Sequence, residues 1–225
     1  MACLILVNGV PPSRAMADAL AARCDTIIAV DGAAAHALSL GLRPDIVCGD
    51  FDSIDMPAAI AGLPDARFVC TPDQSLSDLE KALGIALAAN ERTIYITGAS
   101  GGRQDHELSA ALVLLRCNRE TEICILKDGA ALWAISGALG RLGRLTLDTQ
   151  PGDTVSILSA DGLARITTEG LQWPLTGERL QPGTRGVSNV ALRADASVTV
   201  EDGAVWVCHL YDRLLPWSAA GPAPA

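Results

Sequence analysis

Membrane-spanning runs, clusters of basic residues and a P-loop are all missing from this chain. No apolar stretch approaches the roughly 20 residues of a membrane-spanning helix, so we expect no membrane partner. No Lys/Arg run or basic aromatic stripe occurs and the formal net charge is -9, which argues against a nucleic-acid partner. No Gly-x-x-x-x-Gly-Lys-[Ser/Thr] segment is present, which excludes a P-loop kinase.

The seven cysteines also lack the pattern of a zinc site. Their number is odd, no Cys-x-x-Cys pair occurs, and most lie inside apolar runs, which predicts reduced thiols in a cytoplasmic protein. The three histidines, His36, His106 and His209, do not pair with cysteines at ligand spacing. The first ten residues lack a basic leader and run into Asn8-Gly9, so we expect a first strand rather than a signal peptide.

The first half of the chain alternates between short apolar runs and helical patterns. Strands are expected at Cys3–Val7, Thr26–Val30, Ile46–Cys48, Arg67–Cys70, Thr93–Thr97 and Glu122–Leu126. Apolar helix faces are predicted from Leu79, Ala82, Leu83, Ala86 and Leu87, and from Leu108, Ala111, Leu112 and Leu115. Residues 1–128 are therefore expected to form an α/β domain with a mainly parallel sheet and flanking helices.

The pattern changes after about Lys127, where no long amphipathic helix follows. Strand-like runs lie at Leu132–Ile135, Leu145–Leu147, Val155–Leu158, Ala164–Thr168, Val187–Leu192, Val198–Val200 and Val205–Leu210. Turn signals such as Asp202-Gly203 separate them, which is typical of a small sandwich or barrel. We expect an all-β sandwich domain over residues 129–215 and a disordered tail over residues 216–225.

Polar segments follow several of the expected strands of the first half. They are Asp31-Gly32, Gly49–Ser53, Asp73–Lys81 and Gly101–His106. Because ligands of open α/β sheets bind beyond the carboxyl ends of the strands, the four loops can converge on one ligand. Carboxylates, glycine backbone and an arginine suit a phosphate ester carried by a divalent metal ion, which would offset the repulsion between the acidic chain and a polyphosphate.

Each of these segments also has a purely structural interpretation. Asp50 and Asp52 could bind one Mg²⁺ from the same side of an extended loop, or form a turn. Ser77 and Glu80 match a capping box for a helix over residues 78–89, a role that needs neither Asp78 nor Lys81 as a ligand and can coexist with anion binding.

The glycine-rich segment and Asp31 leave the same choice open. Arg103 offers a two-pronged phosphate contact. Asp105 is either a ligand contact or the N-cap of the next helix, and His106 either contacts the ligand or lies in that helix's first turn. Asp31 is either part of the site or a helix cap.

Taken together and in this order, the segments resemble the thiamin pyrophosphokinase family. The matching segments are Asp31-Gly32-Ala33-Ala34-Ala35, Pro44-Asp45 through Gly49-Asp50-Phe51-Asp52-Ser53, Asp73-Gln74-Ser75-Leu76-Ser77-Asp78-Leu79-Glu80-Lys81-Ala82, Gly101-Gly102-Arg103-Gln104-Asp105-His106, Gly170-Leu171-Gln172-Trp173-Pro174-Leu175 and Ser188-Asn189. The resemblance spans about residues 3–210. Ala33 and Ala35 stand where the family has a second Gly and an Asn.

The resemblance implies a pyrophosphoryl transfer from ATP to the hydroxyl of thiamine, giving thiamine diphosphate and AMP. It also implies Mg²⁺ and a homodimer with shared active sites. The residues carried over are Asp50, Asp52 and Asp78 for the metal, Gln74, Ser77, Lys81, Arg103, Asp105 and His106 for the nucleotide, and Trp173, Ser188 and Asn189 for thiamine. Asp31 or Asp50 would orient or deprotonate the hydroxyl. A pterin-like alcohol as acceptor, or a nucleotide-binding protein with degraded catalysis, are the alternatives.

Overall fold

The structure is a computed structural model that describes residues 1–116, 121–137 and 143–217. It divides into two compact units, and the second begins at Asp128 and also takes in the end of helix α5 from Leu114. The first unit contains β1 (Ala2–Leu6), α1 (Arg14–Ala21), β2 (Thr26–Val30), α2 (Ala33–Leu40), β3 (Ile46–Gly49), α3 (Met56–Gly62), β4 (Arg67–Cys70), α4 (Asp78–Ala88), β5 (Thr93–Thr97), most of α5 (Gln104–Arg116) and β6 (Glu122–Lys127).

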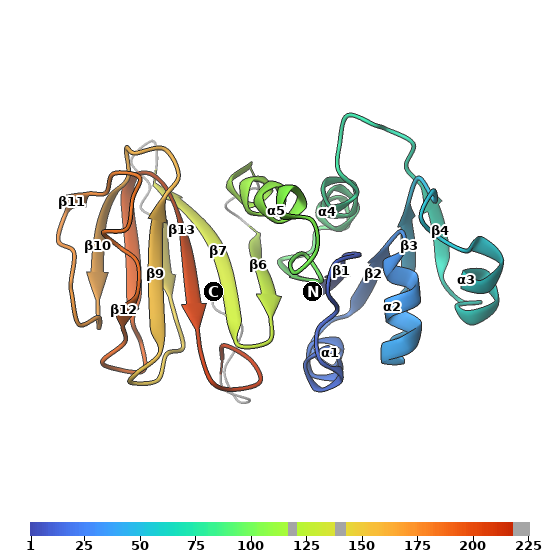
Figure 1. The fold of residues 1–225 in the computed structure, drawn as a ribbon, viewed down its shortest axis with the longest axis horizontal. Coiled ribbons are helices and arrows are strands. Elements are labelled where there is room, and N and C mark those ends of the chain that lie inside the picture. Colours follow the sequence, from blue (N-terminus) through green and yellow to red (C-terminus); the bar gives the residue numbers. More distant parts are fainter. Residues whose placement is uncertain (117–120, 138–142, 218–225) are drawn as a thin grey trace. The chain divides into compact units, whose positions relative to one another are not determined.

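The six strands of the first unit form a parallel sheet in the order β6-β5-β1-β2-β3-β4. The chain runs outward from β1 to β4 and then returns to β5, on the other side of β1. Since such crossovers are right-handed, helices that serve the two directions cover opposite faces. Figure 1 shows α1 and α2 on one side of the sheet and α4 and α5 on the other. The reversal of strand order lies between β1 and β5.

The predicted parallel α/β architecture is confirmed, but the predicted apolar face of α5 is wrong. Leu108 and Leu112 are 61% and 55% exposed, whereas Ala110, Val113 and Leu114 are buried. The helix carries two overlapping apolar stripes. The one that packs inside the chain contains Ala110, Val113 and Leu114. None of the described helices is long and apolar enough to span a membrane.

The second unit consists of strands throughout. They are β7 (Ala130–Gly137), β8 (Gly143–Thr146), β9 (Thr154–Ser159), β10 (Arg165–Glu169), β11 (Glu178–Arg179), β12 (Asn189–Val190) and β13 (Ser197–Leu210). The predicted turn at Asp202-Gly203 is wrong, because β13 is one 14-residue strand. Its first half pairs with β8 and β10, and its second half with β7 and β9. The change of partners coincides with a register shift against β10 and with a left-handed Gly203 (φ 76°), so the strand is irregular there but continues.

Two residues of the expected tail, Pro216 and Trp217, are among the described residues. Trp217 is only 5% exposed, and the carbonyl of Pro216 accepts a hydrogen bond from Arg213. The second unit therefore extends through Trp217, beyond the expected boundary at residue 215. The rest of the expected tail, residues 218–225, lies outside the described residues.

Candidate active site

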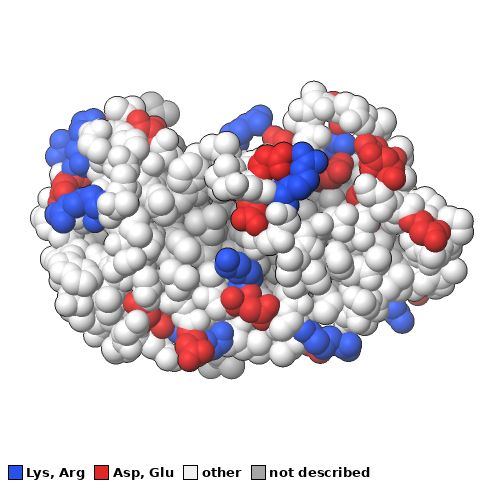
Figure 2. Space-filling view, in the orientation of Figure 1, with Lys and Arg blue, Asp and Glu red and all other residues white. Residues whose placement is uncertain are grey.

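Loops at the carboxyl ends of the first unit's strands surround a cleft of about 760 Å³. All ten catalytic and nucleotide-binding residues expected in the first half line it. They are Asp31, Asp50, Asp52, Gln74, Ser77, Asp78, Lys81, Arg103, Asp105 and His106. Figure 2 shows carboxylates and cations next to one another on the face near α4 and α5. The four loops thus converge on one place, as their positions after the strands predict.

Asp31 is the most buried carboxylate of the cleft. It directly follows β2 with a left-handed backbone (φ 47°), and the residue is 4% exposed. Its Oδ1 is buried and has no hydrogen-bond partner among the described residues. Burial raises the pKa of Asp31, the charges of Asp52 and Asp78 add to the effect, and the Ser53 hydroxyl partly opposes it. A buried carboxylate with an unpartnered oxygen is the group that a cation or a proton would stabilise.

Asp50 and Asp52 are brought together by a turn rather than by an extended loop. Phe51 between them is left-handed (φ 66°), and its ring packs edge-on against Phe68 with centroids 6.2 Å apart. The Asp52 N–H donates to Asp50 Oδ1 at 3.2 Å, which closes the turn. The Gln74 amide donates to Asp50 Oδ2 at 2.9 Å and is the main reason that the pKa of Asp50 is lowered.

The described residues contain one group of three carboxylates whose oxygens could share a metal ion. One oxygen each from Asp31, Asp50 and Asp52 lies within 4.8 Å of the others. Hard carboxylate oxygens at the carboxyl ends of strands suit Mg²⁺, and the unpartnered Asp31 oxygen adds to the fit. Asp78, the third metal ligand that the resemblance implies, lies in the same cleft but outside this group.

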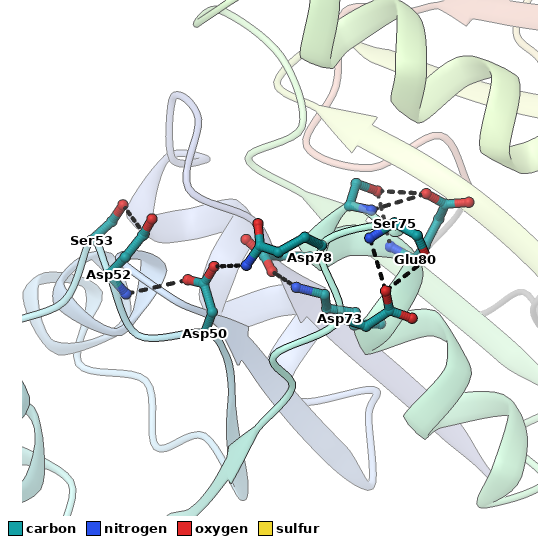
Figure 3. Close-up of polar contacts among 10 residues, drawn as sticks. Asp50, Asp52, Ser53, Asp73, Ser75, Asp78 and Glu80 are labelled. Atoms are coloured by element: carbon teal, nitrogen blue, oxygen red, sulfur yellow. Dashed lines mark hydrogen bonds and ion pairs between the residues drawn. The ribbon is translucent and has the colours of Figure 1, made fainter.

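The first turn of α4 combines a cap with an ion pair. Ser77 and Glu80 form the predicted capping box, in which each side chain accepts from the other residue's backbone N–H. Figure 3 shows these contacts of Glu80 beside the hydrogen bonds of Asp73 and Asp50. The Asp78 carboxylate instead accepts from Lys81 Nζ at 2.8 Å. Capping leaves Asp78 and Lys81 available to the cleft, so the two interpretations of this segment coexist.

Lys81 carries its charge in a site that is almost closed to solvent. Its side chain is 5% exposed. Burial alone would lower the pKa of Lys81, but the hydrogen bond to Asp78 and the charges of Asp78, Asp50 and Asp73 outweigh it and the pKa is raised. The ammonium group therefore stays protonated and can neutralise part of a polyphosphate.

The glycine-rich loop is held by one ion pair and one hydrogen bond of its own. Arg103 donates twice to Asp105, at 2.6 and 3.1 Å, and the guanidinium lowers the pKa of Asp105 to about 2. Asp105 is the second residue of α5 and not its N-cap, because the helix begins at Gln104. His106 lies exposed in the first turn, and the Gly101 N–H donates to the Glu107 carboxylate. Arg103 is 73% exposed, so it can exchange its partner for a phosphate.

The three expected thiamine contacts lie near one another in the second unit. The buried Asn189 side chain accepts from Trp173 N–H at 3.0 Å and donates to the Trp173 carbonyl at 2.7 Å. The Trp173 residue is 53% exposed. Ser188, left-handed at φ 59°, donates its N–H to Ser156 at 3.0 Å. Asn189 thus holds the loop that presents Trp173, and both ends of its amide are already used.

Two family models divide the chain between them. The catalytic domain of thiamin pyrophosphokinase matches residues 17–126, and the vitamin B1 binding domain of thiamin pyrophosphokinase matches residues 144–205. The chain belongs to the thiamin pyrophosphokinase family. Enzymes of the thiamin pyrophosphokinase family transfer pyrophosphate from ATP to thiamine. The first match covers the ten expected residues of the cleft, and the second covers Trp173, Ser188 and Asn189.

Curated thiamin pyrophosphokinases from plants and a nematode are similar over most of the chain. The thiamine pyrophosphokinase 1 of Oryza sativa subsp. japonica is 25% identical over 177 residues, which cover 75% of this chain and 67% of that protein. The thiamine pyrophosphokinase 1 of Arabidopsis thaliana is 27% identical over 177 residues, or 75% and 66% of the two chains. The matched part thus spans about two thirds of these relatives.

Solved structures of the thiamin pyrophosphokinase family share the fold of both units. The Bacillus subtilis thiamine pyrophosphokinase superposes with a TM-score of 0.80 at 20% identity and covers 95% of this chain and 100% of its own. The Candida albicans enzyme gives 0.78 at 16% identity, covering 94% and 89%. At these identities the likeness shows the fold.

The sequence interpretation missed part of the cleft wall. Val7, Asn8 and Gly9, which follow β1, line the same cleft as the four predicted loops. The signal was present, because Asn8-Gly9 follows an apolar run as the other four segments do. Taken alone, Asn8-Gly9 indicates only the end of the first strand.

Proposed function

We propose that the cleft of the first unit binds ATP with a divalent metal ion and transfers its pyrophosphoryl group to the hydroxyl of thiamine. The observation that carries this proposal is the grouping of Asp31, Asp50 and Asp52, with ligand oxygens within 4.8 Å and one buried oxygen unpartnered. Family membership supplies the donor and the acceptor. The cleft supplies the charges that such a transfer needs, since it is mostly positioning and charge neutralisation.

Mg²⁺ is the proposed metal, held by Asp50, Asp52 and Asp78 as the resemblance implies. Asp31 adds a fourth carboxylate, grouped with the first two. When bound, the metal neutralises charge on the polyphosphate and orients it. The nearby Lys81 and Arg103 contribute positive charge to the same cleft.

Asp31, rather than Asp50, is the proposed proton acceptor. The pKa of Asp31 is raised by burial, whereas that of Asp50 is lowered by its hydrogen bond from Gln74. A carboxylate with a raised pKa holds a transferred proton better at neutral pH. The thiamine hydroxyl attacks the β-phosphorus of ATP, its proton passes to Asp31, and the bond to the α-phosphate oxygen breaks to release AMP.

The remaining nucleotide-binding candidates are proposed to hold the polyphosphate. Gln74 and Ser77 contribute an amide and a hydroxyl, and Lys81 a buried cation. The exposed Arg103 exchanges Asp105 for a phosphate oxygen, a change of partner that its fork of donors permits. Asp105 and His106 keep the glycine-rich loop in place.

Thiamine is the proposed acceptor, bound through the second unit. Trp173 offers an exposed aromatic face for a cationic ring. Ser188 and Asn189 shape the surface beside it, Asn189 through its two hydrogen bonds to the Trp173 backbone.

A homodimer with two shared active sites completes the proposal. Neither unit alone carries groups for both substrates. The exposed Leu108 and Leu112 of α5 supply an apolar strip that a second chain can bury. A cytoplasmic location rests on cysteine usage, since all six described cysteines are free thiols.

Incubation of the purified chain with ATP, Mg²⁺ and thiamine tests the proposal. AMP and thiamine diphosphate should form in equal amounts. A pterin alcohol replaces thiamine in a parallel reaction, and AMP formed only there would identify the alternative acceptor. Tight ATP binding without AMP under any condition would indicate a binding protein with degraded catalysis.

A further inference from the structure

Asn8 is a residue of the cleft with no role in the site described above. The Val7 N–H donates to the Thr97 carbonyl and the Gly9 N–H donates to the Gly98 carbonyl, both at 2.8 Å. The pairing of β1 with β5 therefore continues past the ends of both strands and holds the Asn8 backbone in place. The side chain is exposed and lines the cleft.

The position of Asn8 in the sheet is the one where open α/β sheets bind ligands. β1 and β5 are neighbours, and the strand order reverses between them. A ligand crevice forms at such a reversal, beyond the carboxyl ends of the two strands. Asn8 follows the strand on one side of this point, and Gly98 follows the strand on the other.

The Asn8 amide lies against Gly32, directly after the buried Asp31. A Cβ placed on Gly32 would lie 2.4 Å from Asn8 Nδ2 and 3.1 Å from Asn8 Oδ1. The φ of Gly32 is −56°, which any residue adopts. The Asn8 side chain, and not the backbone, thus requires glycine at position 32. The amide makes no hydrogen bond to a described residue, so both of its N–H donors are open to a ligand.

The surroundings of Asn8 favour a phosphate oxygen as that ligand. Asp31, the Gly98–Ser100 segment and Gly102 line the same cleft, and the backbone after Asn8 is hydrogen-bonded to Gly98 and Ser100. A carboxamide donates to an oxyanion without adding charge, and fixed donors of this kind stabilise charge that develops during transfer. We propose that the Asn8 side chain donates a hydrogen bond to a non-bridging oxygen of the ATP polyphosphate, an inference that rests on the proposed function.

Two substitutions at Asn8 separate the donor from the shape of the side chain. Asn8→Ala removes the amide and should lower kcat/KM for ATP roughly 10- to 100-fold, the usual loss for a hydrogen bond to a charged group. Asn8→Asp keeps the shape of the side chain but replaces the donor with a negative charge. It should lower kcat/KM for ATP further than Asn8→Ala does. ATP affinity measured by calorimetry at fixed Mg²⁺ and without thiamine should fall with both. KM for thiamine and the melting temperature should stay close to those of the wild type.

Gly32→Ala tests the contact itself. Its Cβ pushes aside the end of a side chain, so the fold should survive while ATP affinity falls as in Asn8→Ala. The double variant Asn8→Ala/Gly32→Ala should lose no more than Asn8→Ala alone, because the three nearest atoms all belong to the Asn8 side chain. Losses that add in the double variant would contradict the contact.

Ser39→Ala is the matched control, since this exposed hydroxyl on α2 bonds only the His36 carbonyl of its own helix. It should bind ATP as the wild type does. Unchanged ATP affinity and kcat/KM in Asn8→Ala would overturn the inference. A lower melting temperature in Asn8→Ala, together with equal losses of kcat/KM for ATP and for thiamine, would also overturn the inference, since that pattern indicates a structural role. A wild type without turnover would contradict the proposed function, and ATP affinity would still report on Asn8.

Discussion

The ammonium group of Lys81 lies 2.8 Å from the Asp78 carboxylate, one turn earlier on α4, and the lysine side chain is 5% exposed. A first-turn acid that only favours the helix dipole would contribute a few tenths of a kcal/mol to about 1 kcal/mol. Asp78 does more, because it also faces a buried cation and the cleft. The pair therefore offers a way to separate capping from catalysis.

Asp78→Asn should lower turnover by at least about 100-fold if Asp78 holds the metal, because the substitution removes an anionic ligand. The asparagine oxygen can still accept from Lys81, so the melting temperature should fall by only a few degrees. Turnover is measured as AMP release and melting by calorimetry. Glu80→Gln is the control in the same helical turn, and its turnover should be normal. A large melting shift in Asp78→Asn with normal turnover would leave Asp78 only a structural role.

Asp50→Asn and Asp52→Asn should each abolish turnover and leave the fold intact, because the half-buried Asp50 and the exposed Asp52 both line the cleft and each substitution removes an anionic ligand but little packing. Turnover is measured at limiting Mg²⁺, where a lost ligand has its largest effect. Asp18→Asn is the control, because it removes an exposed carboxylate of α1 that does not line the cleft. Its turnover should equal that of the wild type. Wild-type rates in both cleft variants would remove the two residues from the site.

Asp31→Asn should abolish turnover but stabilise the protein in the absence of metal. The wild type buries this carboxylate beside two others, and the amide removes their repulsion. The gain should be on the order of 1 kcal/mol, or about 2–4 °C in melting temperature for a chain of this size. Mg²⁺ should raise the melting temperature of the wild type more than that of the variant. An Asp31→Asn protein less stable than the wild type without metal would contradict the predicted repulsion.

Unfolding of the second unit should depend on pH through His209. The ring is fully buried, Nε2 lies 2.8 Å from Asp153, and burial lowers the pKa of His209. The unfolded chain takes up a proton near pH 6.5 and the folded chain only at lower pH. The contribution of neutral His209 to the free energy of unfolding is therefore complete above about pH 6.5. It falls as the pH drops toward the folded pKa, by at most about 1.4 kcal/mol per pH unit for one proton.

His209→Gln should flatten this dependence between pH 7 and pH 5. Urea unfolding followed by tryptophan fluorescence measures it, because all four tryptophans lie after residue 128 and report on the second unit. His36→Gln, in the first unit, is the control and should keep the wild-type slope. Equal slopes in wild type and His209→Gln would show that another group causes the acid sensitivity.

Mixed dimers test whether two chains share each active site. An Asp50→Asn chain and a Trp173→Ala chain, each inactive alone, should together restore one working site per heterodimer if their groups come from different subunits. Trp173 suits this test better than Asn189, whose side chain holds the local backbone. No rescue in verified heterodimers would place each complete site within one chain.

Much of the first unit could be predicted because its signals are local. Thr26–Val30, Arg67–Cys70 and Thr93–Thr97 are strands at the predicted residues, and the Ser77/Glu80 capping box is confirmed. Short apolar runs and caps are determined by neighbouring residues, which a single sequence displays. The convergence of the four loops follows from the parallel sheet.

The missed features depend on contacts between distant residues. The side of α5 that faces inward is decided by packing, since Leu108 and Leu112 are as apolar as the buried Val113 and Leu114. The grouping of Asp31 with Asp50 and Asp52 needs the left-handed turn at Phe51, which no local rule requires of a phenylalanine. Likewise, Asp202-Gly203 has the composition of a turn and Gly203 is left-handed (φ 76°), yet pairing on both sides makes it part of one strand.

The single long strand β13 bears on how the protein is made. Residues 197–210 pair with β7, β8, β9 and β10, so four strands synthesised earlier have no complete sheet until this segment leaves the ribosome. The parallel sheet of the first unit has all its strands by residue 127. A ribosome adding about 5–20 residues per second leaves several seconds between the two events. During that interval the nascent chain exposes unpaired strand edges, and chaperones that bind them would act on this half of the protein.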